Sequence, residues 1–143
     1  MTEAERRAIE VDCERLIRLY VNLNDAQDWA GVAALYTADA RFARPSRPGE
    51  FVVGREAILE SFLARPARAQ RHVIANTVVD VDDADHARAF SVIVLYMGEA
   101  AEPGELPAMD PNSPLIGTFT DRLVRTDDGW RFSERVGGLD FKP

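Results

Sequence analysis

The order of two hydrophobic periodicities is the feature that most constrains the fold of this chain. Up to about residue 65, apolar residues recur every three or four positions, which is typical of amphipathic helices. The second half instead carries long runs rich in β-branched and aromatic residues, as strands do. Helices followed by strands indicate an α+β fold and not βαβ winding. With 143 residues and no internal repeat or linker, residues 1–143 are expected to form a single domain.

Three helices are expected in the first half. The first spans residues 3 to about 23, and the second follows Asp28 as its N-cap and extends to Tyr36. The third is REAILESFLAR, which Pro66 closes.

The β-rich half predicts two antiparallel hairpins, after two short strands in ARFARP and FVVG. The four long strands of these hairpins lie in QRHVIANTVVDV, ARAFSVIVLYM, GTFTDRLVR and WRFSERVGG. Residues 98–115, between the hairpins, hold four of the chain's eight prolines and are too many for a simple turn. That segment is interpreted either as a lid or subunit contact, or as a solvated acidic loop.

Net charge, hydropathy and cysteine content limit the expected binding partners and cellular compartment. Seventeen basic and 24 acidic residues give a formal charge of −7, which disfavours nucleic acid and anionic membranes as partners. No run of ~18 apolar residues predicts a membrane span, and the charged N-terminus lacks a signal-peptide pattern. The lone Cys13 excludes an internal disulfide and predicts a cytoplasmic protein, and its position on an apolar helix face favours a core role.

No cofactor is indicated by any motif. The chain has no HExxH pattern, paired cysteines or clustered histidines that would hold a metal. It also has no glycine-rich loop after a strand for a nucleotide, and no Ser or Cys in a nucleophile elbow. Chemistry at this protein is therefore expected to be independent of cofactors and metals.

The strand that opens with His72 carries the most informative polar residues. Because strands alternate faces, His72, Ile74, Asn76 and Val78 are expected to share one face, so that two polar groups would point into a cavity together. Asp25, 47 positions earlier, could fix the imidazole tautomer and make His72 a general base near neutral pH. The alternatives are a structural histidine bonded to a backbone carbonyl, and an aspartate that only caps a turn.

Other side chains are weaker candidates. Tyr20 lies on the buried helix face and is favoured as core over proton donor. Phe42 is a candidate for lining a pocket. Which of the arginines at 44, 122, 125 and 135 turn inward stays open, although those at 122 and 125 lie on opposite sides of one strand.

Four segments in this order, DAQDWAGVAALYTADARF, GREAILESFL, RHVIAN and DGWRFSER, resemble the SnoaL-like branch of the nuclear-transport-factor-two-like superfamily. The resemblance covers nearly the whole chain. It implies a strongly curved, mostly antiparallel sheet wrapped around the helices, forming a cone with an apolar pocket at its open end. It also implies a homodimer or another homo-oligomer.

Within that superfamily, scytalone dehydratase and hexachlorocyclohexane dehydrochlorinase use an Asp–His pair, which by resemblance falls on Asp25 and His72. An asparagine of the dehydrochlorinase falls on Asn76. The chain departs from scytalone dehydratase at Ser91, where that enzyme has a second histidine, and at Asn24, where it has a tyrosine.

Ketosteroid isomerase offers a third comparison within the superfamily. Its oxyanion tyrosine matches Tyr20, but its general-base aspartate falls on Arg44, which speaks against steroid isomerisation by that arrangement.

The function predicted from these residues is a cofactor-independent lyase or isomerase of the dehydratase, dehydrohalogenase or cyclase type, acting on a hydrophobic small molecule. His72 and Asp25 would be catalytic, and the predicted substrate-binding residues are Asn76, Tyr20, Phe42 and Ser91. The alternative is a non-catalytic small-molecule-binding protein, or a structural subunit of a ring-hydroxylating dioxygenase.

Overall fold

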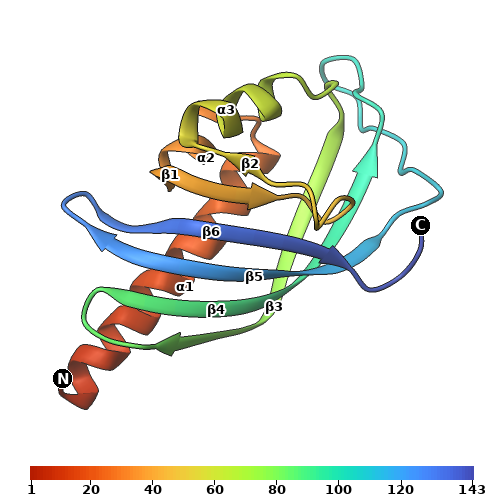
Figure 1. Ribbon diagram of the computed structural model, residues 1–143. Coiled ribbons are helices and arrows are strands. Elements are labelled where there is room, and N and C mark those ends of the chain that lie inside the picture. Colours follow the sequence, from red (N-terminus) through yellow and green to blue (C-terminus); the bar gives the residue numbers. More distant parts are fainter.

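The computed structural model describes residues 1–143 and shows a strongly bent six-stranded sheet with three helices packed on its inner face (Figure 1). The predicted α+β cone is confirmed, with the sheet open and not closed into a barrel. The helices are α1 (Glu3–Asp25), α2 (Trp29–Ala34) and α3 (Arg55–Leu63). The strands are β1 (Tyr36–Ala43), β2 (Val52–Val53), β3 (Ala69–Val81), β4 (His86–Gly98), β5 (Leu115–Thr126) and β6 (Gly129–Leu139).

The sheet has the order β2-β1-β6-β5-β4-β3. All neighbouring strands are antiparallel except β1 and β6, which run parallel. The two predicted hairpins are therefore confirmed as β3–β4 and β5–β6. Because β3 and β4 are 13 residues each and bend sharply, one end of the sheet stays open beside the C-terminal end of α1 (Figure 1).

The second helix is shorter than the sequence predicts. Asp28 is its N-cap, as expected, and accepts a hydrogen bond from the backbone N–H of Gly31 at 2.9 Å. The prediction that Tyr36 belongs to this helix was wrong, because the helix ends at Ala34 and Tyr36 opens β1 opposite Phe132 of β6. Periodicity alone cannot detect this strand, since its pairing partner lies about a hundred residues further along the chain.

A β-bulge in β3 overturns the predicted face of that strand. The ladder passes from Ala75 opposite Val92 to Val78 opposite Phe90, so β3 holds one more residue than β4 at this point. Asn76 adopts a left-handed backbone with φ 50°, which asparagine tolerates better than most residues. Beyond the bulge the alternation is inverted. Asn76 and Val78 are exposed, in contrast to the prediction.

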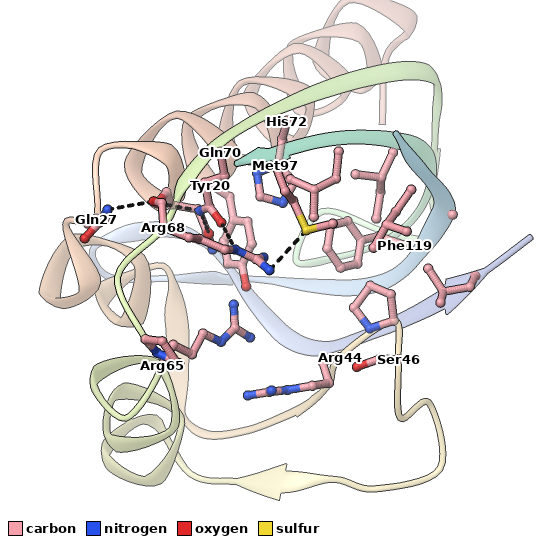
Figure 2. A pocket seen from close by; sticks show the side chains of 18 of the residues that line it. Tyr20, Gln27, Arg44, Ser46, Arg65, Arg68, Gln70, His72, Met97 and Phe119 are labelled. Atoms are coloured by element: carbon pink, nitrogen blue, oxygen red, sulfur yellow. Dashed lines mark hydrogen bonds between the residues drawn. The ribbon is translucent and has the colours of Figure 1, made fainter. Parts of the chain in front are cut away.

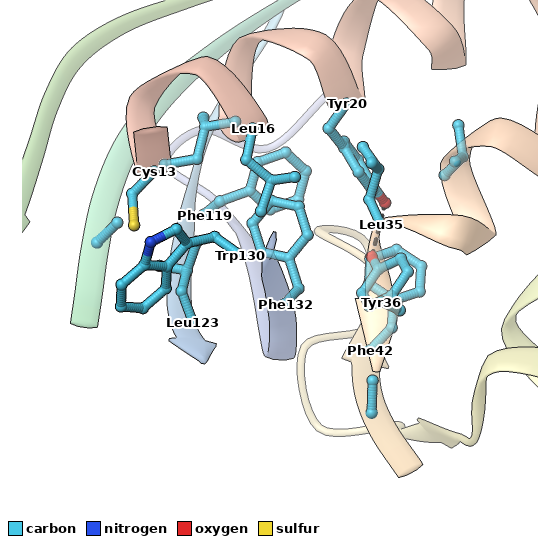
Figure 3. Close-up of a cluster of buried hydrophobic side chains, with 14 of the residues drawn as sticks. Cys13, Leu16, Tyr20, Leu35, Tyr36, Phe42, Phe119, Leu123, Trp130 and Phe132 are labelled. Atoms are coloured by element: carbon cyan, nitrogen blue, oxygen red, sulfur yellow. Dashed lines mark hydrogen bonds between the residues drawn. The ribbon is translucent and has the colours of Figure 1, made fainter. Parts of the chain in front are cut away.

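The core between the helices and the sheet is aromatic (Figure 3), and it contains one buried ion pair. Arg135 and Asp121 are both fully buried and joined by two hydrogen bonds of 2.8 and 3.0 Å. The guanidinium also lies within 4.3 Å of the ring centroids of Tyr20, Phe119 and Phe132. Burial lowers the pKa of Arg135, but the carboxylate of Asp121 outweighs it and the net pKa is raised.

The lone cysteine belongs to the same core. Cys13 is fully buried, and burial raises the pKa of its thiol to about 12. A thiol with so high a pKa is almost never a thiolate at neutral pH, so Cys13 acts as a small apolar side chain.

The segment between β4 and β5 is tied to the sheet near its end. The hydroxyl of Ser113 accepts from the backbone N–H of Met97 at 2.8 Å, and the N–H of Asp110 donates to the carbonyl of Met97 at 2.7 Å. In its middle Leu106 is 95% exposed. None of the three helices combines the length and the apolar composition that a membrane span requires.

Breaking the buried ion pair is expected to destabilise the fold strongly. Asp121→Asn would leave Arg135 charged in a dry aromatic cage, so the free energy of unfolding should fall by about 3–5 kcal/mol. Asp82→Asn removes one partner of the exposed Asp82–Arg88 pair and should lower the free energy of unfolding far less. Urea unfolding of both variants measures the difference. Equal effects would show that the buried pair contributes no more than a surface pair.

Candidate active site

A cavity of about 440 Å³ occupies the open end of the cone (Figure 2). The end of α1 and the start of β3 form one wall, and β4 and β5 form another. Apolar side chains line that second wall, namely those of Ile93, Leu95, Met97, Leu115 and Phe119. The polar lining comes mostly from α1, from the start of β3, and from the segments that follow β1 and α3. A cavity with apolar walls and a few convergent polar groups is the usual form of a small-molecule site.

His72 enters this cavity from β3 (Figure 2), and the carboxylate of Asp25 contacts its ring. The ring nitrogen Nδ1 of His72 lies 2.5 Å from Oδ1 of Asp25. The backbone N–H of His72 donates to the other carboxylate oxygen, Oδ2, at 2.8 Å. The Asp25 side chain is 3% exposed and that of His72 is 11% exposed, so the contact is shielded from water. The structure thus brings together the two residues predicted to pair.

A seam of hydrogen bonds fixes the end of α1 against the start of β3. The side-chain N–H of Gln70 donates both to the backbone carbonyl and to the side-chain oxygen of Asn24, at 3.0 and 2.8 Å. The side chain of Gln27 donates to the carbonyl of Arg68 at 3.1 Å. Asp25 and His72 are the third link of this seam. The dyad is therefore positioned by its neighbours on both elements and not by its own contact alone.

The contact determines which nitrogen of His72 is free. An ionised carboxylate only accepts hydrogen bonds, so Nδ1 of the neutral ring carries the hydrogen. Nε2 is then the unprotonated nitrogen and has no hydrogen-bond partner within the protein. A histidine with this tautomer, held by a carboxylate, has the form of a general base.

Tyr20 also lines the cavity, from α1, and it is part of the aromatic core as well. Its hydroxyl lies 2.7 Å from that of Tyr36 (Figure 3). When Tyr36 donates in this pair, the Tyr20 O–H remains available to a ligand oxygen. Burial raises the pKa of Tyr20, so the hydroxyl keeps its proton at neutral pH.

Three predicted substrate-binding residues do not line the cavity. Asn76 is exposed at the bulge of β3. Phe42 is buried between α3 and β1, where its ring stacks on that of Phe62 with centroids 5.5 Å apart. Ser91 of β4 is fully buried, and its hydroxyl has no hydrogen-bond partner. The bulge displaces Asn76, whereas tertiary packing buries the other two outside the cavity lining.

The arginines left open by the sequence fall into three environments. Arg44 lines the cavity. Arg122 and Arg125 are exposed and lie near Glu134 and Asp85. The fourth, Arg135, is the buried partner of Asp121 described above.

Two further cavity arginines, Arg65 and Arg68, were missed by sequence reasoning. They flank Pro66 in the link between α3 and β3. The signal that could have found them is their place immediately before the strand of His72, because that link must cross the open end of the cone.

No group of three or more potential metal ligands is clustered anywhere in the structure. The cavity lining contains one histidine and no carboxylate, since Asp25 lies behind the His72 ring. The site as it stands offers an oriented base, a tyrosine hydroxyl and arginine side chains to a small molecule.

Comparison with known protein families identifies the family of this chain. Residues 5–136 match the family model described as a SnoaL-like domain. The chain belongs to the SnoaL-like family. No curated protein matches the chain by sequence.

Solved structures similar to this SnoaL-like protein share its fold over nearly the whole chain. A protein assigned as a scytalone dehydratase from Novosphingobium aromaticivorans is 20% identical with a TM-score of 0.83, covering 98% of this chain and 89% of that one. A type 2 hexachlorocyclohexane dehydrochlorinase is 15% identical with a TM-score of 0.79, covering 98% and 90%. A ketosteroid isomerase-like protein from Erwinia carotovora atroseptica is 19% identical with a TM-score of 0.72, covering 92% and 96%. Identities this low show the shared fold alone.

Arg65 is expected to reduce the stability of this SnoaL-like fold. Burial, and next the charge of Arg44, lower the pKa of Arg65 to about 10, so folding disfavours the charged form at every pH below that value. Arg65→Met keeps an apolar contact with the Phe62 ring and removes the charge. The free energy of unfolding should rise by about 1 kcal/mol at pH 7.

Urea unfolding of Arg65→Met at pH 7 tests this, with Arg15→Met on the exposed face of α1 as the matched control. The control should change stability by less than about 0.5 kcal/mol. A marked loss of stability in Arg65→Met would show that contacts of the guanidinium, and not its desolvation, dominate at this position.

Proposed function

We propose that this protein is a cofactor-independent lyase or isomerase that abstracts a proton from a hydrophobic small molecule. The observation that carries the proposal is the contact of the Asp25 carboxylate with Nδ1 of His72, at the wall of an otherwise apolar cavity. The family includes dehydratase and isomerase relatives, which supports a reaction of this general kind.

In the proposed reaction, Nε2 of His72 takes a proton from a carbon atom next to an activating group. Asp25 holds the ring in the required tautomer and stabilises the imidazolium as it forms. In an elimination, the electron pair of the broken C–H bond forms the new double bond, and the leaving group departs with its own bonding pair. In an isomerisation or cyclisation, the same pair is held on a substrate oxygen.

Tyr20 is suited to stabilise that oxygen. Its hydroxyl faces the cavity with its proton retained, and its ring is fixed by the aromatic core. A donor that is already oriented costs no reorganisation when negative charge develops, so it favours the transition state over the ground state. Asn76 is not proposed for this role, because it lies outside the cavity.

An alternative of another class is a non-catalytic small-molecule-binding protein or an assembly subunit. What favours it is that the cavity contains only one histidine, since Ser91 stands where scytalone dehydratase has its second and is itself buried in the core. A general acid for a leaving group would then have to be Tyr20 or water. Assembly as a homodimer or other homo-oligomer stays a prediction.

Replacing His72 should abolish the proposed chemistry. For any compound that wild-type protein converts, His72→Gln should lower kcat by about 10²–10⁴-fold, because the general base is lost. The measurement is ¹H NMR in D₂O on compounds with an acidic C–H beside a halide, hydroxyl or carbonyl group. It follows product formation and deuterium uptake together.

His86→Gln is the matched control, because His86 has an aspartate partner as well, Asp83 at 2.9 Å, but lies exposed at the start of β4. It should turn over at the wild-type rate. Activity of His72→Gln within about threefold of wild type would contradict the base assignment.

A further inference from the structure

Three arginines converge on the cavity without a carboxylate to neutralise them. Arg44 follows β1, and Arg65 and Arg68 follow α3, and all three line the cavity. Figure 2 shows Arg44 and Arg65 extending into the same region of the cavity, on the far side from His72 in this view. The chain has 24 acidic residues and a charge of −7, yet no aspartate or glutamate lines this cavity.

The contacts of these guanidinium groups leave hydrogen-bond donors unused. The side chains of Arg44 and Arg65 take part in no salt bridge, and Nε of Arg65 is buried without any hydrogen-bond partner. Arg68 donates only to the neutral groups of Gln70 and Met97. Three other arginines also lack a carboxylate partner, but Arg55 and Arg131 donate to backbone carbonyls and Arg15 is exposed. Among the arginines without a carboxylate partner, only Arg44, Arg65 and Arg68 line the cavity.

Keeping such groups together without a counter-charge is unfavourable. Burial, and next the charge of Arg44, lower the pKa values of both Arg65 and Arg68. An anion between them would supply the missing counter-charge and the missing acceptors together. The planar, forked donors of a guanidinium match the two oxygens of a carboxylate.

We infer that Arg44, Arg65 and Arg68 form an anion subsite, and that the molecule bound in this cavity is a hydrophobic acid whose carboxylate they hold. The apolar wall of β4 and β5 takes the body of that molecule, which a cavity of about 440 Å³ can accommodate as two fused rings. This inference rests on the proposed function only in placing the substrate in the same cavity as His72.

The carboxylate in this arrangement is an anchor and not the reacting group. His72 approaches from β3, whereas Arg44 and Arg65 approach from the ends of β1 and α3. Binding energy from the anchored end would orient a carbon atom at the other end toward Nε2 of His72. The arginines are therefore positioning residues that set specificity for an acid.

Binding of 2-naphthoate and of its neutral isostere 2-naphthamide, measured by isothermal titration calorimetry on the full chain, tests this. Wild type should bind the carboxylate at least about tenfold more tightly than the amide, and added salt should reduce this preference. Arg65→Gln and Arg44→Gln should each lower the preference severalfold while leaving the affinity for the amide nearly unchanged. Arg15→Gln, which removes the same charge from the exposed face of α1, should preserve it.

His72→Gln separates this inference from the proposed function, because neither probe can be turned over. That variant should keep the preference for the carboxylate even if it is catalytically inactive. Equal binding of both probes by wild type would overturn the anion subsite. A preference that survives both Arg→Gln substitutions, or that vanishes in His72→Gln, would overturn its assignment to the arginines.

Discussion

The rest of this site depends on the two hydrogen bonds between the Asp25 carboxylate and His72. One carboxylate oxygen binds the imidazole and the other binds the backbone N–H of the same residue, so a single side chain fixes both the ring and the strand that carries it. This joins the last residue of α1 to the start of β3. The seam made by Gln27 and Gln70 then prevents the two elements from sliding.

Two arginines in apolar surroundings, Arg135 and Arg65, differ in whether a carboxylate neutralises them. Deep in the core, Arg135 is matched by two hydrogen bonds from Asp121 and surrounded by aromatic rings, which makes it a structural cation. At the open end, Arg65 has a ring of Phe62 against it but no carboxylate. An arginine thus stabilises the fold at position 135, whereas at position 65 its guanidinium keeps a hydrogen-bond donor without an acceptor. Sites built for ligands commonly retain such unfavourable groups, because the ligand completes them.

The sequence predicted the α+β order and both hairpins, because periodicity and chain order carry that information. The resemblance to the SnoaL-like family, and not periodicity, indicated that Asp25 and His72 lie together. It could not predict the bulge at Asn76, since one extra residue in a strand leaves the hydrophobic pattern locally plausible yet inverts its faces. It also could not show that Ser91 and Phe42 are buried outside the cavity lining, because their positions depend on how the bent sheet packs against the helices. Arg65 and Arg68 were missed because no periodicity marks a link between elements.

The position of the proton on the neutral His72 ring tests the pairing of Asp25 with His72 most directly. Long-range ¹H–¹⁵N NMR correlation spectra of labelled protein, recorded where the ring is neutral, distinguish the two tautomers. The structure predicts hydrogen on Nδ1 of His72 in wild type, and loss of that preference in Asp25→Ala, while Asp83→Ala changes only His86. Hydrogen on Nε2 of His72 in wild type, or a spectrum of His72 that Asp25→Ala leaves unchanged, would contradict the dyad.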